Sequence, residues 1–152
     1  MPESIRERIL SDLTAAVSGV TQAAGYAIDI RTVGRVRREP YQAHEYPAVN
    51  LLEGPERKQA GPTALTTCFL PVVLEISVWD KNALAVAANR AMAAVIKATL
   101  ADRTRGGLAI DTEETGNKMF VDETDPTRPI GGFRVEFTIE YRHAESDPYS
   151  VN

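Results

Sequence analysis

Apolar residues in the first part of the chain recur with the period of an α-helix. They lie three and four positions apart and form one stripe: Ile5, Ile9, Leu13, Ala16 and Val17. Just before this stripe, Ser4 and Glu7 have the spacing of a capping box, which satisfies free N–H groups at a helix start. Gly19 marks the expected end. The pattern predicts an N-terminal helix with one buried face.

A second helical pattern, rich in alanine, occupies the middle of the chain. Its apolar positions keep the same period: Leu84, Ala88, Ala91, Met92, Val95, Ile96 and Leu100. Asp80 or Asn82 can cap its start, and the pattern continues to about Ala101. Because alanine side chains are short, this helix can approach a β-sheet closely.

Other segments alternate between apolar and polar residues, which is the pattern of a strand with one buried face. The clearest alternation lies near the end of the chain: Phe133, Val135, Phe137, Ile139 and Tyr141. The remaining predicted strands cover 26–36, 48–53 and 66–79, with short β segments at 106–110 and 118–121 on either side of a turn at 115–117. Pro71 has no N–H to donate, so it predicts an edge position or a bulge.

Three connections rich in proline or glycine separate these elements, near 36–47, 54–65 and 122–132. Loops of that length in a small domain are often functional, and 54–63 is the best candidate for a mobile one. The strands are too clustered for repeated βαβ units, which favours the α+β class. We expect a single domain over 1–152, with two helices packed on one face of a mostly antiparallel sheet, in the order α-β-β-β-α-β-β.

The composition is typical of one folded domain. The 152 residues are 43% hydrophobic and 25% charged. Charges interrupt every apolar run before the ~20 residues of a membrane helix, and the first residues, MPESIRERIL, lack the apolar region of a secretory signal. The single cysteine is consistent with a reducing compartment. A net charge of −4 provides no overall attraction to nucleic acid or to an anionic membrane.

Little in the sequence points to a reaction centre. His44, His143 and Cys68 lie far apart, and no zinc-ligand spacing occurs. The acidic residues between 111 and 125 do not fit a calcium loop. Cys68 lies in an apolar β segment, which is more typical of a buried residue than of a nucleophile. We therefore expect no catalytic residue, no bound metal and no cofactor.

Charges are segregated along the chain. Arg31, Arg35, Arg37 and Arg38 fall within eight residues that contain no acid. Acidic residues crowd a later segment in which only Lys118 opposes them: Asp111, Glu113, Glu114, Asp122, Glu123 and Asp125. Two interpretations are open. Either both segments are solvated surface, or the basic segment of one copy meets the acidic segment of the next in a head-to-tail contact that can close a ring.

In chain order come the capped first helix, the segment YPAVNLLEGP, the strand LPVVLEISVW, the alanine-rich helix and the closing strand that ends in EYRHAESDPY. This order of segments resembles the tail terminator family of long-tailed phages, also called the tail completion or minor tail protein U-like family. The resemblance spans nearly the whole chain. The most suggestive part is this aromatic and charged strand leading into Asp147-Pro148-Tyr149.

The resemblance implies a small structural subunit of the virion tail that is assembled in the host cytoplasm. It implies a homo-hexameric ring that caps the head-proximal end of the tail tube, stops tube polymerisation and joins the tail to the head. The expected partners are other copies, the tail tube protein and the head completion or connector protein, while DNA passes through the lumen without specific recognition. The alternatives are a head–tail connector or stopper subunit, or a small oligomeric α+β enzyme or ligand-binding domain.

Overall fold

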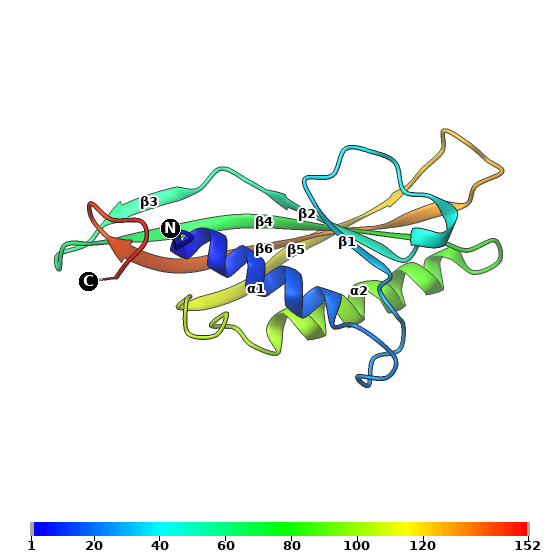
Figure 1. Ribbon diagram of the computed structural model, residues 1–152. Coiled ribbons are helices and arrows are strands. Elements are labelled where there is room, and N and C mark those ends of the chain that lie inside the picture. The colour runs from blue at the N-terminus through cyan, green and yellow to red at the C-terminus, as the bar shows by residue number, and fades with distance from the viewer. Residues whose placement is uncertain (1, 152) are drawn as a thin grey trace.

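The computed structural model describes residues 2–151 and places two helices against one face of a β-sheet (Figure 1). In chain order the elements are α1 (Ile5–Ser18), β1 (Thr32–Arg35), the short 3-10 helix η1 (Ala43–Glu45), β2 (Ala48–Glu53), β3 (Arg57–Ala60), β4 (Leu65–Trp79), α2 (Leu84–Leu100), β5 (Asp111–Val121) and β6 (Ile130–Ala144). The predicted α+β class, with a mostly antiparallel sheet, is confirmed. The order differs from the prediction in one respect, since four strands rather than three precede α2.

The sheet is built around two long central strands. Its strand order is β1-β2-β4-β6-β5, and β3 pairs with β4 beyond the end of β2. β4 and β6 pair along their full 15 residues, from Leu65 opposite Ala144 to Trp79 opposite Ile130. All pairs are antiparallel except β1 with β2, which run parallel. β1 and β5 are therefore the two opposite edges of the sheet.

The hydrophobic core lies between the helices and one face of this sheet. Every second residue of β4 from Cys68 to Val78 is buried there, as is every second residue of β6 from Phe133 to Tyr141. This is the alternation that the sequence shows in both segments. The opposite face carries the polar residues of β6, and the 36–47 connection crosses the part of that face near β1 and β2 (Figure 1).

Helix α1 forms where its pattern predicts. Ser4 Oγ accepts a hydrogen bond from the Glu7 N–H at 3.1 Å, and the helix ends before Gly19. The buried face consists of Ile5, Ile9, Leu10, Leu13 and Val17. Ala16, which the pattern assigned to this face, is only half-buried.

Helix α2 ends one residue earlier than predicted and begins without a side-chain cap of its own. Its N-cap residue is Ala83. Asp80 Oδ1 instead accepts hydrogen bonds from the N–H groups of Asn82 and Ala83, at 2.9 and 2.8 Å. Of the two predicted caps, Asp80 thus supports the helix start and Asn82 does not.

Two predictions about the first half of the sheet are wrong. The strand predicted over 26–36 is reduced to β1, because residues 26–31 form an irregular connection. In this connection the Ile30 N–H donates to the Val20 carbonyl and the Arg31 N–H donates to the Pro47 carbonyl. The loop predicted over 54–65 contains β3, whose four residues pair with residues 66–69 of β4. All four side chains of β3 are exposed, so no buried alternation marks this strand in the sequence.

Pro71 lies in a central strand rather than at an edge. It pairs with Thr138 of β6, and on its other side β2 ends opposite Val72 while β3 begins opposite Phe69. The Pro71 carbonyl accepts the Gly54 N–H at 2.8 Å in this gap. Because the N and O atoms of a strand residue point to the same side, the missing N–H faces the gap and costs no ladder hydrogen bond.

The turn predicted at 115–117 is a β-bulge within one continuous strand. β5 runs from Asp111 to Val121 along β6, and its register shifts between Glu114 and Gly116. The extra residue bends the edge without ending it. The β segment predicted at 106–110 is a series of turns instead.

Candidate functional site

The two charged segments singled out in the sequence lie at opposite edges of the sheet. The basic segment 31–38 contains edge strand β1, and the acidic segment 111–125 contains edge strand β5. β2, β4 and β6 separate them. The fold therefore keeps the two segments apart within one copy and presents them on different sides of the molecule.

Arg35 is largely engaged within its own chain. Its guanidinium forms a two-pronged ion pair with Glu7 of α1 and a second ion pair with Glu53 of β2, at 3.2 Å. Glu53 also accepts from Arg6 of α1 at 2.8 Å. These contacts fasten α1 to the edge of the sheet, and the hydrogen bonds from Arg35 lower the pKa of Glu7.

Arg37 is held in a similar way by the connection that follows β1. Both of its terminal nitrogens lie 2.9 Å from the Glu45 carboxylate, and its guanidinium carbon lies 4.2 Å from the centre of the Tyr41 ring. Its side chain is 23% exposed, and that of Arg35 is 30% exposed. The interpretation of the basic segment as solvated surface therefore fails for Arg35 and Arg37, whose charges are neutralised within the chain.

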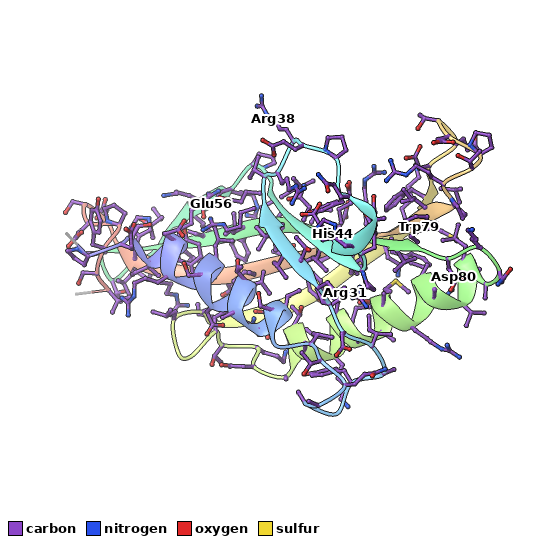
Figure 2. All side chains as sticks on the ribbon, turned by 45° about the vertical axis from the view of Figure 1, so that its right-hand side comes forward. Arg31, Arg38, His44, Glu56, Trp79 and Asp80 are labelled. Atoms are coloured by element: carbon purple, nitrogen blue, oxygen red, sulfur yellow. The ribbon has the colours of Figure 1, made fainter. Side chains whose placement is uncertain are left out.

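Arg31 and Arg38 are the free charges of the basic edge. Both side chains are exposed, and within residues 2–151 neither forms an ion pair. Arg38 projects from the 36–47 connection, and Arg31 lies at the start of β1 (Figure 2). Any attraction between this edge and an acidic partner rests first on these two side chains.

The acidic edge also contains both engaged and free carboxylates. Asp111 forms an ion pair with Arg103 at 2.7 Å, which lowers its pKa. Glu113 and Glu123 are exposed, and Glu114 is half-buried. No ion pair of these three glutamates occurs within the described part of the chain.

The loop between β5 and β6 is organised by two consecutive turns of the same kind. Asp122 Oδ1 accepts from the N–H and hydroxyl of Thr124, and Asp125 Oδ1 accepts in the same way from Thr127, at 2.6–3.0 Å. These hydrogen bonds lower the pKa of both aspartates. The repeated Asp-x-Thr pattern thus gives this acidic loop a defined shape.

A cluster of polar side chains around the buried Tyr141, which sequence reasoning missed, lies where α1 meets β3, β4 and β6. The Tyr141 hydroxyl donates to Glu56 and also contacts the thiol of Cys68. Arg6 and Lys58 lie 3.5 and 3.6 Å from the two oxygens of Glu56. The only sequence signal is indirect, since Tyr141 and Cys68 occupy inward positions of two alternating strands.

This cluster does not form a nucleophilic pair. His143 Nδ1 donates to the Ala144 carbonyl at 2.6 Å, so Nε2 is free to accept from Lys58 Nζ at 3.0 Å. The Cys68 thiol lies against the Tyr141 hydroxyl, and burial raises the pKa of this thiol. Burial beside Glu56 also raises the pKa of Tyr141. A protonated thiol without a base is inert as a nucleophile.

Within residues 2–151, no group of three or more His, Cys, Asp or Glu side chains is arranged to hold a metal ion. No helix in this part of the chain has the length and apolarity needed to cross a lipid bilayer. A comparison with models of known protein families finds no match, and no curated protein sequence is significantly similar to this chain.

Proposed function

We propose that this protein is a structural assembly subunit of the tail terminator type. In this role, copies form a ring that caps the head-proximal end of a phage tail tube, stops tube polymerisation and joins the tail to the head connector. The order of sequence segments resembles that family, and the fold places two oppositely charged segments at different edges of the sheet. The virion tail is the expected location, and other copies, the tube protein and the connector are the expected partners.

The observation that supports this function best is the separation of the charged segments to opposite edges of one sheet. A closed ring requires a head-to-tail contact, in which two different surfaces of the same chain meet. The exposed Arg31 and Arg38 belong to one edge, and the exposed Glu113 and Glu123 belong to the other. Such charges would set partner choice and register more than raw affinity.

The free edge of β5 adds a second possible means of association. An edge strand offers unpaired N–H and C=O groups to a further strand. Apolar side chains are also exposed along this edge, with Met119 40% and Val121 51% exposed. A solitary domain would gain from covering them, and a neighbouring copy in a ring would do so.

The deciding experiment is negative-stain electron microscopy of the purified protein, alone and mixed with tail tubes whose ends are open. We expect six-fold rings with an open lumen, or density that caps one end of each tube and stops further growth. Tubes that elongate unchanged in the presence of the protein, together with an absence of rings, would refute the proposed function. Binding to isolated head connectors but not to tubes would favour the connector subunit instead.

Variants of the basic edge test directly whether its exposed charges take part in ring formation. The double variant Arg31→Glu and Arg38→Glu should weaken ring formation while leaving the circular dichroism spectrum unchanged, because both side chains are exposed. Lys81→Glu is a matched control, since Lys81 is an exposed cation outside that edge. Rings that form as well with the double variant as with Lys81→Glu would remove the basic edge from the interface.

A further inference from the structure

The exposed side of α2 is basic and only lightly covered. Residues 81–101 contain three cations and no acid. Two of these cations, Arg90 and Lys97, are exposed and form no ion pair within the described residues. They are seven residues apart, which is two helical turns or about 10 Å along the axis.

A groove lies between these two cations. It has a volume of about 330 Å³, and Ala93 and Ala94 form its floor on α2. The connection at Gly25–Ala27 forms its other wall, where Lys97 Nζ lies 5.5 Å from the centre of the Tyr26 ring. The same connection continues along the chain through Arg31 into β1.

The acidic β5–β6 loop, residues 122–129, has the complementary character, and we call it the knob. It carries three carboxylates, Asp122, Glu123 and Asp125, against the single cation of Arg128. Both aspartates are held by their threonine turns, which leaves the exposed Glu123 between them. Little loop entropy would be lost if this shape docked as it stands.

The knob and the groove cannot meet within one copy. The knob projects from one end of the sheet on the side away from the helices, whereas the Gly25–Ala27 connection lies beside α2 on the helix side, in both views (Figures 1 and 2). A contact between them therefore joins two molecules. Because the two surfaces differ, it is a head-to-tail contact of the kind that closes a ring.

We infer that the knob of one copy docks in the Tyr26–Arg90–Lys97 groove of the next copy. Glu123 lies between Arg90 and Lys97 in this contact, and the alanine floor lets the loop approach α2 closely. The inference rests on the proposed function, because it names the contact by which the subunits of that ring recognise one another. The occupant is a second copy of this chain.

The test exchanges charges across the contact and measures self-association by sedimentation equilibrium at low ionic strength. Glu123→Lys places a cation of the knob opposite Arg90 and Lys97, and Lys97→Glu places a carboxylate of the groove opposite Glu123. Each variant alone should associate at least ~10-fold more weakly than the natural protein, since like charges then face each other. Arg8→Glu and Glu145→Lys carry the same charge changes at exposed positions outside the contact, and they should associate as the natural protein does.

The equimolar mixture of the two variants gives the decisive result. Every contact in an alternating ring of the two copies pairs opposite charges again, so the mixture should recover the association that each variant loses. A mixture as weak as its components, variants that associate normally, or a natural protein that stays monomeric at its highest soluble concentration would overturn the inference. The tube-capping assay separates the two proposals, because natural protein that caps tubes upholds the function even when the groove contact fails.

Discussion

Truncation of Phe137 tests which face of the sheet holds the core. Phe137 is fully buried on the helix-facing side of β6, where it pairs with Val72 of β4. A phenylalanine side chain buries roughly 150–250 Å². At ~25 cal/mol per Å² its complete burial is worth about 4–6 kcal/mol. Alanine keeps part of this area, but the cavity adds a cost, and core Phe→Ala changes lower the free energy of unfolding by about 3–5 kcal/mol.

Phe69 provides the matched control on the other face of the same sheet. It is half-buried, and the guanidinium carbon of Arg57 lies 4.2 Å from the centre of its ring. Loss of an exposed cation–π contact costs ~0.5–1 kcal/mol, and partial burial adds a similar amount. We therefore expect Phe69→Ala to destabilise the protein by about 1–2 kcal/mol, clearly less than Phe137→Ala.

Urea denaturation can measure both variants. Trp79 is the only tryptophan of the chain and is half-buried at the end of β4, so its fluorescence reports on the sheet, while circular dichroism reports on the helices. For a chain of this size each kcal/mol shifts the melting temperature by about 2–4 °C, so Phe137→Ala should lower it by roughly 6–20 °C. A loss below ~1 kcal/mol for Phe137→Ala, or equal losses for the two variants, would show that the helix-facing side of the sheet does not hold the core.

Three further predictions concern the ion pairs and the sheet. Hydrogen bonds from Arg35 lower the pKa of Glu7 in the folded state, so this pair stabilises the fold above the ordinary pKa of 4.5, and that stabilisation is lost as the pH falls below it. In Glu7→Gln the free energy of unfolding should therefore vary less with pH across this acidic window. A pH profile identical to that of the natural protein would contradict the pairing. Arg35→Met should lower the melting temperature more than Arg31→Met, because of the two only Arg35 forms ion pairs with α1 and β2. Equal melting temperatures of the two variants would show that the ion pairs of Arg35 do not stabilise the fold. Gly132→Ala should lower the free energy of unfolding, measured in urea, by ~1–3 kcal/mol, because a Cβ at this position would collide with the carbonyl of Ile76 on β4. An unchanged urea midpoint of unfolding would mean that β4 and β6 can move apart at this point at no cost.

The strongly periodic elements could be predicted from the sequence because their local pattern and their tertiary environment agree. α1 has a cap at one end and one apolar stripe, and β6 alternates along its length because only one of its faces is buried. The missed elements depend on a distant partner. β3 has four exposed side chains and exists because residues 66–69 of β4 extend beyond β2 and offer a free edge. Gly116 and Asn117 directly follow the extra residue of the bulge in β5 and locally favour a turn, but the long partner β6 keeps the strand continuous.

The charge pattern illustrates what a sequence leaves undetermined. The basic segment is locally free of acids, yet Arg35 meets Glu7 and Glu53, which are 28 and 18 positions away. Arg37 meets Glu45 through a loop whose path no local signal specifies. The sequence thus predicted two charged regions, and only the fold shows which of their charges are already neutralised within the chain.

The full-length pairing of β4 with β6 also has a mechanical consequence. Fifteen residue pairs in register make a ladder about 50 Å long. Leu65 lies at the same end as Ala144, so pulling those two positions apart would open the ladder one pair at a time, like a zipper. Pulling the Leu65 end of β4 against the Ile130 end of β6 instead loads the whole ladder in shear, because the two strands are drawn along each other. The fold should therefore yield easily to force in the first direction and resist it in the second, and single-molecule pulling from these two pairs of attachment points would measure that anisotropy.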